Sequence, residues 1–186
     1  TSFYHKLLVL KLPENAISKN TNLNVDMKSG SIELSQFDLN KLSLSNVSGS
    51  TKVLESKFNV ADINNVSGTI RIENCDITEL KTNSVSGSIY AEGTFSKADS
   101  NVVSGGISIT NKKDFEKDSS FNAVSGTITI ELPENNNAKL KCETKSGTVR
   151  NELTNSKGKN ITESMGNGTY SLEASTESGS ITITKN

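Results

Sequence analysis

Tryptophan is absent from this chain of 186 residues, and aromatic residues make up only 5% of it. Single-stranded nucleic acids are bound on aromatic platforms and basic grooves. Here the basic residues are not concentrated anywhere, and the net charge is −1. We therefore expect no nucleic-acid partner.

Histidine occurs once, at His5, which leaves the many serines of the chain without a neighbouring base. A serine nucleophile needs such a base to activate it. His5 itself is expected to be a surface residue of a strand, and no Gly-x-Gly-x-x-Gly or Walker phosphate loop occurs. The sequence thus predicts a non-enzymatic protein with no cofactor.

Long hydrophobic runs are also missing, since no segment reaches the roughly 18 apolar residues that cross a bilayer. The apolar stretch Phe3–Leu12 ends at Pro13 and has no small-residue cleavage site, so it is predicted to be the first strand. Because the chain begins at Thr1 rather than at methionine, we expect that a signal peptide, a membrane anchor or another domain preceded it.

What the chain does have is a repeated Ser-Gly dipeptide. The glycine of this dipeptide recurs every 18 to 21 residues as far as Gly147. One more interval of 21 residues reaches Gly168, where Asn167 replaces the serine. A period near 20 residues is typical of solenoids, in which each repeat is one coil stacked on its neighbours. The glycines of the dipeptides, spaced by 18 to 21 residues up to Gly147, are Gly30, Gly49, Gly68, Gly87, Gly105, Gly126, Gly147 and Gly179.

The residues around each glycine form columns that alternate between apolar and polar. Such period-2 alternation with β-branched residues predicts half-buried strands on both sides of each glycine, which would turn a corner between them. The column two places after the glycine contains Ile32, Thr51, Ile70, Ile89, Ile107, Ile128, Val149, Tyr170 and Ile181. The column two places before it contains Val47, Val66, Val85, Val103 and Val124.

These columns predict an all-β fold, a right-handed parallel β-helix of about 20 residues per coil and eight to nine coils. One domain is expected over 1–186, with the N-terminal strand and first coil in 1–22 and capping strands in 166–186. The strand Ser178–Thr184 is predicted to cover one end of the rod. The charged segment Lys112–Lys117 is expected to be a loop within a longer coil.

Two cysteines are present, Cys75 and Cys142, 67 residues apart. Over three coils this separation corresponds to roughly 15 Å along the rod, whereas a disulfide needs Cα atoms within about 7 Å. We expect two free thiols, with Cys142 in the core.

Carboxylates recur five places after the glycine. Stacked about 5 Å apart, they would repel each other unless calcium or neighbouring basic residues relieved the charge. The alternative is a solvated column balanced by Arg71, Arg150 and Lys52, and this alternative is favoured. The candidate metal column contains Glu73, Glu92, Glu131, Glu152 and Glu173.

Asparagines recur near the same corner, at Asn46 and Asn65 and, one place earlier, at Asn83, Asn101 and Asn122. Stacked amides can satisfy buried backbone groups at a bend. The sequence therefore predicts an inward ladder of asparagine side chains.

The Val-Ser-Gly-(Ser/Thr) phrases at Val47, Val66, Val85 and Val124, together with the run Leu132–Val149 and the ending 166–183, resemble a bacterial adhesin-like family of unknown function. The resemblance implies a right-handed β-helix, often extracytoplasmic or linked to envelope-stress systems, and no catalytic residues. Lys145 and Glu177 depart from the family pattern because they replace the valine.

Three functions stay open. The first is a non-enzymatic module of the cell surface or envelope that binds a protein or glycan partner. The second is a polysaccharide-active β-helix enzyme, which would need two carboxylates in one cleft. The third is a regulatory or sensor domain of an envelope-stress system.

Overall fold

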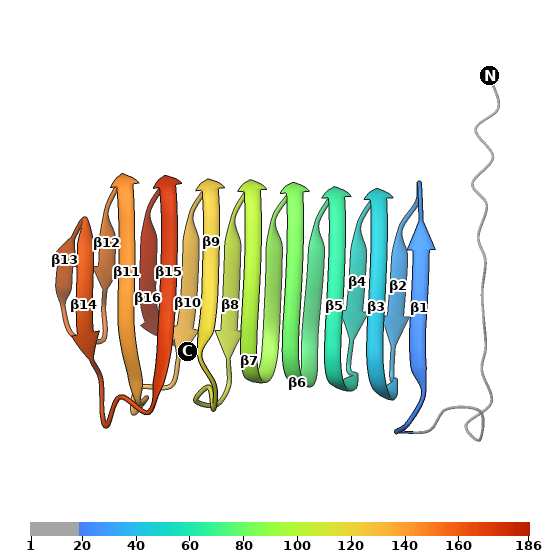
Figure 1. Cartoon of the computed structure of the whole chain (residues 1–186), viewed down its shortest axis with the longest axis horizontal. Helices are drawn as coiled ribbons and strands as arrows, with labels where there is room; N and C mark the ends of the chain where they lie inside the picture. The colour runs from blue at the N-terminus through green and yellow to red at the C-terminus, as the bar shows by residue number, and fades with distance from the viewer. Residues whose placement is uncertain (1–18) are drawn as a thin grey trace.

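The structure, a computed structural model, describes residues 19–186 and consists of strands joined by short turns. The predicted strand Phe3–Leu12, His5 and most of the expected first coil lie outside the described residues. The chain rises along one sheet, crosses at the top, and descends along a second sheet behind it while it advances along one axis (Figure 1). This path is a right-handed parallel β-solenoid, which confirms the predicted fold.

Two sheets face each other across a narrow core. We call them the front and back sheets after their places in Figure 1. The front sheet contains β1 (Asn22–Met27), β3 (Asp38–Ser48), β5 (Lys57–Ser67), the second halves of β6 (Ile70–Ser86) and β7 (Ile89–Ser104), β9 (Ser119–Ser125), β15 (Tyr170–Ser178), β11 (Ala138–Ser146) and β14 (Asn160–Ser164). The back sheet contains β2 (Ile32–Ser35), β4 (Thr51–Leu54), the first halves of β6 and β7, β8 (Ile107–Asn111), β10 (Ile128–Leu132), β16 (Ile181–Lys185), β12 (Val149–Asn151) and β13 (Ser156–Gly158).

The core is made of aliphatic ladders in register. Each turn places an equivalent residue next to the one before it, as in the pairings of Ile70 with Ile89 and of Ile89 with Ile107. Each such buried side chain contributes roughly 1.5–3 kcal/mol. The back-sheet ladder continues through Ile128, Ile181 and Val149, all of them fully buried.

The upper corners require glycine. Gly87 has φ 145°, and a Cβ added to it would lie 2.1 Å from the carbonyl oxygen of Gly68 in the preceding turn. At the lower corners the chain turns instead with Gln36, Glu55 and Asn74, whose φ values are 62°, 46° and 53°. Non-glycine residues rarely adopt this left-handed region, so the lower corners could not be recognised from their residue types.

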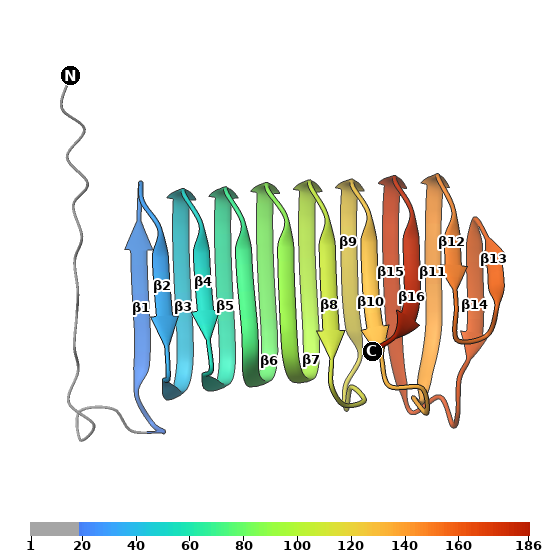
Figure 2. The same cartoon turned by 180° about the vertical axis from the view of Figure 1, so that it is seen from behind.

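The solenoid makes about six turns of about 19 residues each before the stacking order departs from the chain order. These turns follow chain order from β1 to β10. After β10 the chain skips one position and forms β11 and β12, and β15 and β16 later fill the gap (Figure 2). Glycine spacing cannot reveal this exchange, because the corner geometry is the same in either order.

The predicted capping role of 166–186 is therefore wrong. Strand β16 lies between β10 and β12, and β15 lies between β9 and β11. The end is instead covered by β14, antiparallel to β11, and by β13, antiparallel to β12. Gly168 belongs to the loop before β15, with φ 59°, and does not join the corner stack.

The predictions for the loop and the thiols are confirmed. No regular structure forms between β8 and β9, where Lys112–Lys117 lies, and Phe115 from this loop packs its ring 6.2 Å from that of Phe121. Cys75 and Cys142 are both free and buried.

Candidate functional site

The candidate carboxylate column does not form one continuous site. Glu73 and Glu92 are neighbours, but Thr110 follows Glu92, and Thr184 follows Glu131. Thr110 donates a hydrogen bond of 3.0 Å to Glu131. Glu173 lies in β15 of the front sheet, beside Lys141, because Gly168 is not a corner.

Basic side chains lie beside the remaining glutamates. Arg71 lies 3.3 Å from Glu73, and Lys112 lies 2.9 Å from Glu92. Thr184 donates a 2.8 Å hydrogen bond to Glu152. Within residues 19–186, no three His, Cys, Asp or Glu side chains come together in a way that could hold a metal ion.

A second feature, on the front sheet, is a row of exposed valines. Each lies two places before a corner glycine, where the strand directs its side chain outward, and each is 46–50% exposed. Contiguous exposed aliphatic side chains are uncommon on monomeric proteins and often mark interaction sites. We call this set the valine row; it contains Val47, Val66, Val85, Val103 and Val124.

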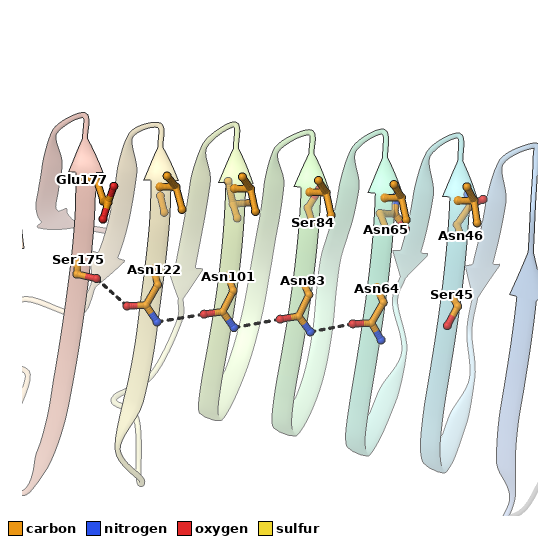
Figure 3. A pocket seen from close by; sticks show the side chains of 17 residues that line it. Ser45, Asn46, Asn64, Asn65, Asn83, Ser84, Asn101, Asn122, Ser175 and Glu177 are labelled. Atoms are coloured by element: carbon orange, nitrogen blue, oxygen red, sulfur yellow. Dashed lines mark hydrogen bonds between the residues drawn. The ribbon is translucent and has the colours of Figure 1, made fainter.

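Beside the valine row, outward-facing amides form a hydrogen-bonded chain (Figure 3). We call it the asparagine ladder; it contains Asn64, Asn83, Asn101 and Asn122 and ends on Ser175. The amide nitrogens of Asn83, Asn101 and Asn122 each donate to the amide oxygen of the preceding turn, over 2.8, 3.0 and 3.1 Å. An amide has two N–H donors and two acceptor sites, so each member keeps hydrogen-bonding capacity toward solvent.

The predicted inward ladder is confirmed only for two residues. Asn46 and Asn65 are buried and donate to the carbonyl oxygens of Gly30 and Gly49, over 3.0 and 3.2 Å. The prediction is wrong for Asn83, Asn101 and Asn122, whose amides bond to one another on the outer face. They stand one place earlier in the repeat, and an offset of one residue turns a strand side chain to the opposite face.

The valine row and the asparagine ladder enclose a shallow groove of about 670 Å³ over β3, β5, β6, β7, β9 and β15. We call this surface the valine–asparagine face. The valine column was recognised in the sequence, but its side chains were not assigned to the outer face. Its place two residues after the outward asparagines was the signal that could have done so.

Charged residues continue the valine row at both ends. Lys28 precedes Val47, while Glu177 and then Lys145 follow Val124. Lys145 and Glu177 form an ion pair of 2.6 Å. Lys28 makes no ion pair with any residue of the described part of the chain.

Farther from the corner, the outer face of the front sheet carries ion pairs. The Asp99 carboxylate, 2.9 Å from Lys97, raises the pKa of this lysine. Lys117, 2.6 Å from Glu79, lowers the pKa of this glutamate. These exposed pairs compensate charge locally and contrast with the uncharged middle of the valine–asparagine face.

Among the described residues, no helix is long and apolar enough to cross a membrane. No curated protein and no solved structure matches the chain. The model of one protein family, described as Toastrack DUF4097, matches residues 1–184. The match spans nearly the whole chain and agrees with the β-solenoid described above, so this chain belongs to the Toastrack DUF4097 family, a β-helix family of unknown function.

Proposed function

We propose that this chain is a non-enzymatic, adhesin-like binding module of the bacterial cell envelope. In this proposal the valine–asparagine face holds a partner protein. The observation that carries the proposal is the valine row, five aliphatic side chains that are about half exposed in successive turns.

The chemistry of the face favours a protein over a glycan. Sugar-binding surfaces commonly offer flat aromatic rings, and the residues that line the groove include none. An aliphatic row beside amides with spare donors and acceptors suits a protein surface, because apolar contact supplies affinity and the amides supply orientation.

A binding module also agrees better with the acidic residues than an enzyme does. Hydrolysis of a glycosidic bond needs a pair of carboxylates flanking one bond. The back-sheet glutamates are spread along the rod and lie beside Arg71, Lys112 or threonine hydroxyls. We expect no turnover of pectins or peptidoglycan fragments, and release of reducing ends from either would overturn the non-enzymatic assignment.

The proposal is tested by binding of the labelled full chain to isolated bacterial cell envelopes. The variant V66T/V103T keeps β-branched side chains but replaces methyl groups with hydroxyls in the valine row. We expect this variant to bind at least tenfold more weakly. A matched control, S108E/T182E, changes two outward residues of the back sheet, and its binding should equal that of the wild type.

Thermal unfolding of each variant shows whether the fold is kept. Digestion of the envelopes with a protease before binding identifies the partner class, and a protein partner requires that binding be lost. Equal binding of V66T/V103T and wild type, or binding that survives the protease, would overturn the proposal.

A further inference from the structure

We propose that the valine–asparagine face pairs with the same face of a second copy of this chain, with the two solenoid axes antiparallel. This inference rests on the proposal that the face is a protein-binding surface and names the partner. It comes from the order of charges along the valine row.

The charges stand symmetrically about one valine. Lys28 lies three turns before Val85, and Glu177 lies three turns after it, as the strand pairings require. With about 4.8 Å per turn, the two charges are each roughly 14 Å from Val85 and on opposite sides of it. Val85 is thus midway between the cation of Lys28 and the anion of Glu177, beyond which the row continues with Lys145, the ion-pair partner of Glu177.

A two-fold axis through Val85, perpendicular to the rod and in the plane of contact, makes this row self-complementary. It sets Val85 against Val85 and Val66 against Val103. Lys28 of each copy then faces Glu177 of the other, so both ends are matched in charge. Such an isologous contact is the commonest arrangement in homodimers.

The parallel arrangement lacks this match. A two-fold axis along the rod would set Lys28 against Lys28 and Glu177 against Glu177. Like charges placed opposite each other across an interface disfavour it. Charge therefore selects the antiparallel orientation.

The asparagine ladder is compatible with the same axis. Asn83 would face Asn83, and Asn64 would face Asn101. Asn83 and Asn101 each use one donor within the ladder, and Asn64 uses one toward Asp62. Each amide keeps a second N–H and a second lone pair. Amide can thus bond to amide across the contact without leaving either group unpaired.

The size of the face indicates a weak dimer. Seven turns of about 4.8 Å and two outward columns about 7 Å apart cover roughly 400 Å² per copy. The total of about 800 Å² lies below the 1,200–2,000 Å² of stable complexes. We therefore expect a dissociation constant in the micromolar range.

Sedimentation equilibrium of the full chain, from about 5 to 500 μM, tests the association. We expect a reversible monomer–dimer equilibrium, weakened at least tenfold in the V85E variant, which places two like charges on the axis. The control T129E, on the back sheet, should dimerise as the wild type does. A monomer at all concentrations, or a dimer indifferent to V85E, would overturn the inference.

Cysteine cross-linking tests the orientation. Both native thiols are buried, so an introduced surface cysteine is the reactive one. A mixture of the single variants K28C and E177C should form a disulfide-linked pair under mild oxidation, whereas K28C alone and T129C alone should not. Cross-linking of K28C to itself would establish the parallel arrangement and overturn the proposal.

The two proposals fail in different ways. A monomeric chain whose envelope binding still depends on Val66 and Val103 would refute the second copy and keep the binding module. A dimer that forms through Val85, with envelope binding indifferent to the valine row, would keep the pairing and refute the proposed function.

Discussion

The first six turns and the C-terminal part of the rod use the same ladders but follow the chain differently. In β1 to β10, each turn stacks on the turn before it in sequence. Beyond β10, strands β15 and β16 lie between strands that precede them in the chain. The comparison shows that stacking depends on matching columns, whereas the order of turns depends on loops and on what covers the end.

Contacts from the loop between β8 and β9 favour the out-of-order position of β15. Asp114 of this loop accepts hydrogen bonds from Tyr170 at 3.3 Å and from the side chain of Asn137 at 2.9 Å. Asp118 accepts from the backbone N–H of Ser171 at 2.7 Å. Burial raises the pKa of Tyr170, so its hydroxyl stays a neutral donor to Asp114.

Deletion of residues 169–186 should have the largest effect, because it removes the turn between β9–β10 and β11–β12. The large buried side chains Tyr170, Leu172, Ile181 and Ile183 are lost, at roughly 1.5–3 kcal/mol each. Since solenoid turns contact only their neighbours, we expect the first six turns to stay folded and β11–β14 to unfold. Hydrogen exchange measures both parts.

Thiol labelling of the deletion variant gives an independent measurement. Cys75, in the first six turns, should stay protected, whereas Cys142, which pairs with Ala174 of β15, should react at least tenfold faster than in the full chain. The exposed edge of β10 should also promote aggregation. Equal protection of both cysteines would contradict the comparison.

Corner glycines should be equally important in both parts. A Cβ on Gly87 would lie 2.1 Å from the Gly68 oxygen, and one on Gly179 would lie 2.0 Å from the Gly126 oxygen. We expect Gly87→Ala and Gly179→Ala each to lower the free energy of unfolding by about 3 kcal/mol or more, through backbone displacement and strain. Urea denaturation is the measurement.

Gly158→Ala is the matched control, since its added Cβ would lie 3.4 Å from its nearest neighbour outside the adjacent residues, the carbonyl oxygen of Asn160. Its effect should stay below about 1 kcal/mol. If Gly179→Ala were as mild as the control, the out-of-order turn would not be stacked as tightly as the others.

Two fully buried asparagines, one in the first six turns and one in the C-terminal part, differ in their hydrogen bonds. Asn111 bonds to both backbone groups of Phe95 at 2.9 Å, whereas Asn151 donates to Glu163 at 3.3 Å and accepts from the Leu153 N–H at 3.1 Å. Asn111→Ala leaves two buried backbone groups unpaired and should cost about 2–3 kcal/mol, against about 1 kcal/mol for Asn151→Ala. Thermal and urea unfolding should show a larger loss of stability for Asn111→Ala than for Asn151→Ala. The opposite result would contradict the role given to Asn111. Exposed Asn59→Ala should change little.

The smallest effect concerns pH. Burial raises the pKa of the Cys142 thiol from 9.0 to about 12. The unfolded thiol ionises first, so the stabilising contribution is complete below pH 9 and falls as pH rises toward 12, by about 1 kcal/mol at pH 10. In Cys142→Ala the decline in unfolding free energy between pH 8 and 10 should be shallower. An identical slope would show that the thiol reaches solvent in the native state.

Much of the fold could be predicted from particular residues. The columns after the corner glycines, such as Ile70, Ile89 and Ile107, gave the strands and the buried face. The side of the sheet on which each asparagine lies was harder to predict. Asn65 and Asn83 differ by one place in the repeat, and only the alternation of side chains along a pleated strand assigns them to opposite faces. The valine row was visible in the sequence as a column. Its exposure follows from the same alternation of side chains, but this conclusion was not reached from the sequence.

The sequence by itself determined the repeat, the two-sheet solenoid and the glycine corners, because these depend on local alternation and on backbone angles closed to other residues. Only the tertiary structure decided the order of the last turns, the identity of the end cap and the dispersal of the glutamates. Those features depend on contacts between residues 30 to 56 positions apart, such as Tyr170 with Asp114, and equivalent turns with the same column pattern can stack in more than one order.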